Sequence, residues 1–123
     1  MKRILFSNQY CIFRSGVILG ECKVTVDSGV CKMITTINAK TNEDDMVELD
    51  IQSDCPYVLK MSWAIRPVFA FLVVEAPMCE TDIYQLASKN LAHTACPVPS
   101  GILKAIEVAG ELGIKRDASI RIE

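Results

Sequence analysis

The chain has 123 residues, of which 50% are apolar and 23% are charged, with a formal net charge of −2. This size and apolar content predict a folded domain with its own core, and they exclude an intrinsically disordered chain. Acidic and basic residues nearly balance. We therefore expect no nucleic-acid partner, because proteins that grip nucleic acids carry clustered basic side chains.

No segment of the sequence has the pattern of a membrane anchor. The longest apolar run, residues 68–74, is far shorter than the ~20 residues that a membrane-spanning helix needs. Near the N-terminus, polar residues at positions 7–9 and Arg14 interrupt any apolar core of a signal peptide. We therefore expect no membrane contact and a cytoplasmic location.

The first half of the chain has the alternating pattern of β-strands. Three segments carry it, at residues 22–27, 31–39 and 46–52. The last alternates strictly, with apolar side chains on one face and acidic ones on the other. A short polar turn at residues 42–45 joins the second and third segments, which predicts an antiparallel hairpin. Residues 1–21 have no clear period and are interpreted as an N-terminal arm or an edge strand before a single domain over residues 22–123.

The second half of the chain favours helices. We expect them over residues 57–65, from Thr81 or Asp82 to Leu91, and from a cap at Ser100 to a stop at Gly113. Ser53 or Asp54 is a candidate cap for the first of them. The run at residues 68–74 fits a buried helix or a strand, and the alternation at 118–122 predicts a short final strand. Together these elements predict an α+β fold, in which about three helices pack on one face of a small antiparallel sheet.

Six cysteines are many for a chain of this length. In a reducing compartment they indicate metal binding or thiol chemistry rather than a disulfide framework. Cys31 stands at the start of the predicted hairpin and Cys55 just beyond its end. Adjacent antiparallel strands lie about 5 Å apart, so we expect these two cysteines to be neighbours in space.

A further pair of ligand-type residues, His93 and Cys96, precedes the last predicted helix. Their spacing allows both to bind one ion, and a thiolate near a helix N-terminus is stabilised by the helix dipole. Three cysteines and a histidine suit tetrahedral zinc, and thiolates suit an iron–sulfur cluster equally well. Cys79 is the alternative to His93 as the fourth ligand. We interpret the remaining two cysteines as core residues.

Two other functions fit the same residues. The first is thiol redox or transfer chemistry, with Cys96 as the nucleophile and Cys31 or Cys55 as the resolving thiol. The second is a structural domain whose buried cysteines are inert. The sequence contains no phosphate-binding glycine loop, nucleophile elbow or H-E-x-x-H motif, and it has a single histidine. It therefore does not predict an enzyme.

Three short motifs carry a resemblance to known proteins. Residues 26–31 (VDSGVC), 53–56 (SDCP) and 93–99 (HTACPVP) resemble an uncharacterised family of small cysteine-containing proteins from anaerobic bacteria and methanogenic archaea. This resemblance covers about residues 22–123. A more distant one is to iron–sulfur cluster scaffold proteins of the IscU and NifU type, in which cysteines flank a hairpin and a His–Cys pair opens a late helix.

The scaffold resemblance implies a role for each matching residue. Cys31, Cys55, His93 and Cys96 would be the ligands of a transient cluster or of zinc, and protein partners would receive the metal or the cluster. Two residues separate His93 from Cys96, whereas the scaffold proteins have none there. Lys32 also follows the first cysteine, where the scaffold proteins have glycine.

Overall fold

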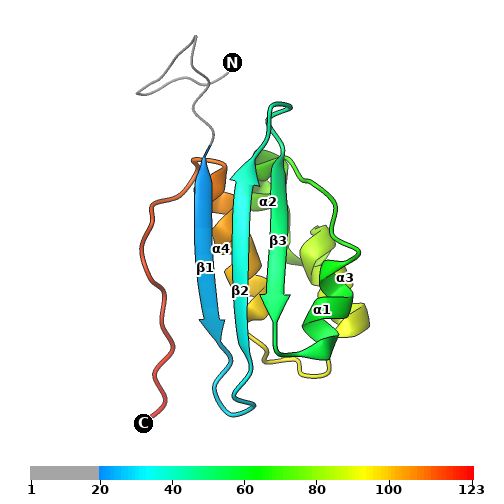
Figure 1. Ribbon diagram of the computed structural model, residues 1–123, viewed down its shortest axis with the longest axis vertical. Coiled ribbons are helices and arrows are strands. Elements are labelled where there is room, and N and C mark those ends of the chain that lie inside the picture. Colours follow the sequence, from blue (N-terminus) through cyan, green and yellow to red (C-terminus); the bar gives the residue numbers. More distant parts are fainter. Residues whose placement is uncertain (1–19) are drawn as a thin grey trace.

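A computed structural model describes residues 20–123 of the chain. The predicted N-terminal arm over residues 1–21 lies almost entirely outside this range, as does Cys11. The described part contains one antiparallel sheet with the order β1-β2-β3 (Figure 1). Its strands are β1 (Glu21–Asp27), β2 (Ile34–Thr41) and β3 (Val47–Ser53).

The predicted hairpin is confirmed as the pair β2 and β3. The two strands pair antiparallel, with Ile37 opposite Ile51. The polar turn between them is closed by Asn42, whose Oδ1 accepts hydrogen bonds from the backbone N–H of Asp44 (2.8 Å) and Met46 (3.1 Å). This local Asn turn supplies the chain reversal that the alternating pattern on either side requires.

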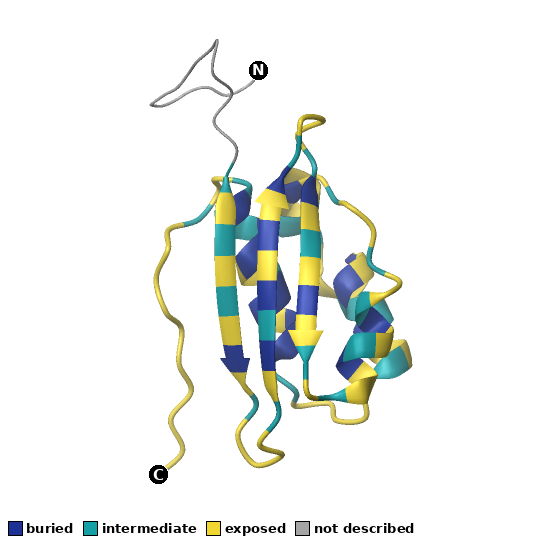
Figure 2. Cartoon of the chain, in the orientation of Figure 1, coloured by how far each residue is buried: buried dark blue, intermediate teal, exposed yellow. Residues whose placement is uncertain are grey.

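The alternation along the strands decides which face of the sheet is buried (Figure 2). Ile37, Ala39 and Ile51 point to the face that is covered by helices and are almost fully buried. Their sequence neighbours on the other face are polar or charged, and all are exposed except the half-buried Thr36. One face of the sheet therefore builds the core, and the other remains open to water.

The described part of the chain also contains four α-helices and a 3₁₀ helix. They are α1 (Pro56–Ser62), α2 (Ala70–Glu75), η2 (Met78–Glu80), α3 (Asp82–Asn90) and α4 (Val98–Ala109). Helix α4 packs on β1 and β2, α1 contacts β3, and α2 and α3 pack against these two helices. The α+β fold is thereby confirmed. None of the helices within residues 20–123 has the length and apolar content to cross a membrane.

The apolar run at residues 68–74, which the sequence left open between helix and strand, divides between the two. Most of it belongs to α2, while Val68 forms an isolated antiparallel bridge with Val47. The predicted start of α3 is confirmed, because Thr81 Oγ1 accepts a hydrogen bond from the N–H of Tyr84 at 3.1 Å.

The boundaries predicted for α4 are wrong at both ends. The helix begins at Val98 rather than after Ser100, because Pro99 is tolerated in a first turn, where its missing N–H has no partner to lose. It ends at Ala109, ahead of the predicted stop at Gly113. A Cβ at the next position, Gly110, would overlap the Cβ of Ala70 in α2, so a glycine is needed at this crossing.

The predicted final strand at residues 118–122 is also wrong. These residues form no strand, and none of the backbone hydrogen bonds in the described part of the chain involves them. Alternation alone does not make a strand without a partner for its backbone groups.

Helix α4 lies unusually close to the sheet at both of its ends. Near its start, a Cβ on Gly101 would overlap Cγ2 of Val26. At its end, the buried hydroxyl of Thr41 donates a hydrogen bond to the carbonyl of Ala109 at 2.7 Å, which satisfies a carbonyl that the helix itself leaves free. The position of α4 along the strands is therefore fixed at two points.

The contact at Gly101 can be tested by adding one methyl group. We expect Gly101→Ala to lower the free energy of unfolding by roughly 1–2 kcal/mol, because overpacking outweighs the helix propensity that alanine adds. Urea denaturation measures this difference. Lys104→Ala, on the exposed side of the same helix, is the control and should change stability by less than about 0.5 kcal/mol. Equal stability of the two variants would contradict the close approach.

Candidate functional site

Three loops meet at one end of the sheet, which we call the thiol end. They are the β1–β2 turn (residues 28–33), the corner between β3 and α1 (54–55) and the loop between α3 and α4 (91–97), all at the lower end in Figure 1. These loops carry Cys31, Cys55, His93 and Cys96. The structure therefore brings four of the five predicted ligands to one end of the fold.

Cys31 lies in the turn between β1 and β2, not in a strand. The turn is closed by a hydrogen bond from the N–H of Ser28 to the carbonyl of Met33 at 3.1 Å. Gly29 and Lys32 have positive φ angles of 82° and 62°, which tighten the reversal. Because β2 begins only at Ile34, the expectation that Cys31 faces Cys55 across the strand ladder is wrong. The side chain of Cys31 is exposed on the turn.

Cys55 lies at a corner that hydrogen bonds of Asp54 tie to the first residue of β2. Asp54 donates its N–H to the carbonyl of Ile34 at 3.1 Å, and its carboxylate accepts the N–H of Ile34, also at 3.1 Å. Asp54 therefore binds the first residue of β2 and does not cap α1. Cys55 occupies the N-cap position of α1 without a side-chain capping bond. It donates its own N–H to Ser53 Oγ at 3.0 Å, and its side chain is half-buried against the core.

Cys96 and His93 form a single turn before α4. The N–H of Cys96 donates to the carbonyl of His93 at 3.2 Å, so the backbone holds the two residues together. The side chain of Cys96 is half-buried against the core, whereas His93 is exposed. The predicted pairing of these two residues in one loop therefore agrees with the local geometry.

Cys79 is the one predicted ligand that the fold keeps away from this group. It belongs to η2, which precedes α3, whereas His93 follows the other end of that helix. A helix of nine residues is about 13 Å long at 1.5 Å per residue. Cys79 is exposed, and its carbonyl accepts a hydrogen bond from Gln85 at 3.4 Å.

The four residues of the thiol end do not surround a common point in this conformation. Across residues 20–123, no three histidine, cysteine, aspartate or glutamate side chains are grouped closely enough to hold a metal ion. For the three sulfur atoms to share an ion, at least one of the loops that carry them must move toward the others.

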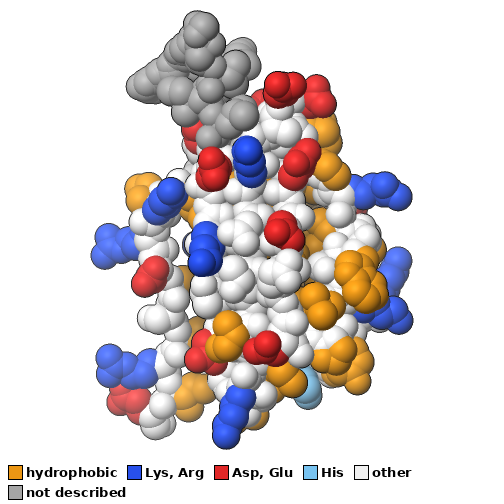
Figure 3. Space-filling view, in the orientation of Figure 1, with side chains coloured by type: hydrophobic (Ala, Val, Ile, Leu, Met, Phe, Trp, Pro, Cys, Tyr) orange, Lys and Arg blue, Asp and Glu red, His pale blue; other side chains and the backbone are white. Residues whose placement is uncertain are grey.

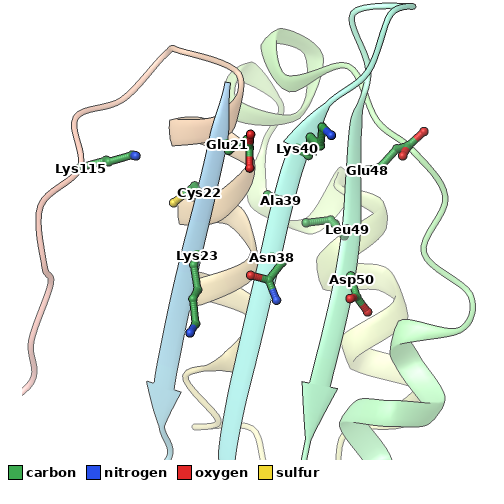
Figure 4. A pocket seen from close by; sticks show the side chains of 10 residues that line it. All are labelled: Glu21, Cys22, Lys23, Asn38, Ala39, Lys40, Glu48, Leu49, Asp50 and Lys115. Carbon is green, nitrogen blue, oxygen red and sulfur yellow. The ribbon is translucent and has the colours of Figure 1, made fainter. Parts of the chain in front are cut away.

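A second feature, which the sequence did not indicate, lies on the open face near the other end of the sheet. A hollow of about 510 Å³ is lined by residues of all three strands, charged and polar ones together with Cys22, Ala39 and Leu49, and by Lys115 from the C-terminal segment (Figure 4). Lys40 on β2 stands between Glu21 and Glu48 in the strand register. Figure 3 shows basic and acidic side chains spread over this face. These charges neutralise one another across the strands, which is typical of a solvated sheet face.

Cys22 lies at the edge of this hollow on β1. Burial raises the pKa of the Cys22 thiol, and the ammonium group of Lys115 lowers that pKa in part. In Figure 4 the side chain of Lys115 reaches toward β1 beside Cys22. This arrangement places the C-terminal segment next to the edge of the sheet.

Comparison with known sequences identifies the family. A family of unknown function, DUF6951, matches residues 22–122, and the chain belongs to it. No curated protein and no solved structure matches the chain. The expectation of an uncharacterised family is thereby confirmed, whereas the likeness to iron–sulfur scaffold proteins stays a prediction.

The different surroundings of the cysteines predict an order of alkylation. At neutral pH we expect exposed Cys31 and Cys79 to react with iodoacetamide before half-buried Cys55 and Cys96. Cys22 should react slowly, because its raised pKa leaves little thiolate, and its rate should keep rising as the pH approaches that pKa. Peptide mass spectrometry over a time course measures each rate.

Lys115 provides the control for Cys22. Lys115→Met removes the nearby positive charge and should slow Cys22 further, whereas Lys115→Arg keeps the charge and should preserve the rate. The assignment would be contradicted if Cys22 reacted as fast as Cys31, or if both variants behaved alike.

Proposed function

We propose that this member of the DUF6951 family binds a metal ion or an iron–sulfur cluster at the thiol end, through Cys31, Cys55 and Cys96 with His93 as the fourth ligand. The observation that carries the proposal is topological. Three separate loops, distant in sequence, bring three thiols and the imidazole to the same end of one sheet.

This set of donor atoms can bind either a zinc ion or an iron–sulfur cluster. Three thiolates and one imidazole give the tetrahedral coordination that zinc prefers, and thiolates also hold iron–sulfur clusters.

The four ligands differ in how firmly the protein holds them. Cys55 and Cys96 are half-buried, and backbone hydrogen bonds to Ser53 and His93 fix their positions. Cys31 is exposed on a turn. In the proposed mechanism the first two sulfurs form the fixed part of the site, and the β1–β2 turn moves Cys31 toward them when the ion binds.

An exposed ligand on a movable turn suits transient binding better than permanent storage, because one arm of the site can open toward another molecule. We therefore propose a scaffold or carrier role, in which partner proteins receive the metal or cluster, in keeping with the scaffold resemblance. This role requires free thiols, which a reducing cytoplasm maintains. It does not require the protein to be an enzyme.

Purification without oxygen tests the proposal. We expect the wild-type protein to carry close to stoichiometric zinc, or iron with acid-labile sulfide and visible absorption. Cys31→Ala, Cys55→Ala and Cys96→Ala should each lower the metal content several-fold, since each removes one sulfur ligand. Elemental analysis and absorption spectra measure this, with circular dichroism to verify that each variant is folded.

Cys79→Ala is the matched control, because it removes an exposed thiol at the far end of α3. It should leave the metal content unchanged. Folded wild-type protein that stays metal-free even when zinc or iron and sulfide are supplied would contradict the proposal. Equal losses in Cys79→Ala and Cys55→Ala would contradict the choice of ligands.

A further inference from the structure

Strand β1 is an edge strand whose outer side has no strand partner among residues 20–123. In this described range, β1 pairs only with β2. The outer edge of β3, in contrast, is partly occupied by the bridge between Val47 and Val68 and by α1. An uncovered strand edge presents a row of free backbone donors and acceptors that another strand can pair with.

The register shows which residues of β1 present these free groups. The N–H of Thr41 donates to the carbonyl of Gly20, and the N–H of Ser28 donates to the carbonyl of Met33. Hydrogen-bonded pairs alternate along an antiparallel ladder, so the even-numbered residues between these two points bond to β2. The N–H and C=O groups of the odd-numbered residues therefore point outward. These residues are Glu21, Lys23, Thr25 and Asp27.

The C-terminal segment, residues 114–123, has the composition of a strand that lacks a partner. It runs beside β1 and in the same direction in Figure 1, and Lys115 lines the same hollow as Glu21. Its isoleucines at positions 114, 120 and 122 are 86%, 83% and 91% exposed. Three nearly fully exposed isoleucines at even positions define an apolar side that water now covers.

One parallel register of the C-terminal segment against β1 places an opposite charge beside every charged residue of β1 on the open face. With Lys115 beside Glu21, the pairs that follow are Asp117 with Lys23, Ser119 with Thr25 and Arg121 with Asp27. The three charged pairs all join opposite charges, which stabilises neighbouring strands. On the other face, Ile120 falls beside Val26 and extends the apolar layer under α4, while Arg116 falls beside Cys22 at the far end of the strand.

The handedness of the chain explains why the segment does not join its own sheet. In Figure 1, β1 and β3 point downward, α2 and α4 lie behind the sheet, and α4 leads to the left-hand edge. A parallel strand formed there would be connected to β3 through the helices by a left-handed crossover. Such connections are right-handed in about 98% of cases. A strand supplied by another molecule has no such connection.

We propose that two copies of this chain exchange their C-terminal segments, each adding a parallel fourth strand to β1 of the other in the register that pairs Lys115 with Glu21. Gly110 and Gly113 sit where the segment leaves α4 and serve as the hinge of the exchange. Each exchange satisfies free backbone groups of β1 and covers exposed isoleucines. The proposal is independent of metal binding at the thiol end.

A disulfide can capture this register. In the proposed register, residue 116 lies beside Cys22. Arg116→Cys should therefore give a covalent dimer when the full chain is oxidised. Peptide mass spectrometry should identify the bond between position 116 and Cys22. Asp117→Cys is the control, because position 117 falls on the opposite face of the strand and should give at least several-fold less of the dimer. A bond within one chain, or no bond to Cys22, would overturn the proposal.

Charge reversal tests the same register without a covalent bond. Arg121→Asp should weaken dimerisation in sedimentation or light scattering several-fold, because a symmetric exchange contains the pair twice. Combining it with Asp27→Arg should restore the wild-type association. A wild-type protein that stays monomeric up to millimolar concentration, or a double variant no better than the single one, would overturn the exchange.

Discussion

The close packing of α4 on the sheet is the constraint that positions the functional features proposed at both ends of this molecule. Gly101 allows the start of the helix to lie against Val26, and Thr41 holds its last carbonyl at the other end. Because the helix is fixed at both points, the loop that carries Cys96 must lie at the thiol end. The C-terminal segment must likewise leave the helix beside the outer edge of β1. The two contacts that hold α4 on the sheet thus position both the loop of Cys96 and the proposed exchange strand.

The sequence predicted those parts of the fold that local chemistry decides. The hairpin follows from strict alternation around an Asn42 turn, and the start of α3 follows from the hydroxyl of Thr81. Two of the failures depend on distant contacts, whereas the start of α4 depends on Pro99 in its own first turn. The end of α4 depends on Ala70 in another helix. The alternation at residues 118–122 was correctly recognised, but a strand also needs a partner edge and an allowed connection, which no local pattern contains.

As with the fold, the sequence predicted the general position of the candidate site but not its details. The hairpin was sufficient to bring Cys31 and Cys55 to one end of the sheet, and the helix start was sufficient to place Cys96 near a helix N-terminus. The predicted position of Cys31 in a strand was wrong, because the hydrogen bond between Ser28 and Met33 closes a turn that contains this residue. The separation of Cys79 from the others could not be predicted, because it depends on the direction in which α3 runs.

X-ray absorption spectroscopy at the zinc edge tests the central claim most directly, because it counts the sulfur atoms bound to the metal. The sample is the full chain, reduced, stripped of metal and then given one equivalent of zinc. The account predicts a first shell of roughly three sulfurs at about 2.3 Å and one nitrogen at about 2.0 Å. A first shell of only nitrogen and oxygen, or a spectrum identical to that of zinc in buffer, would contradict it.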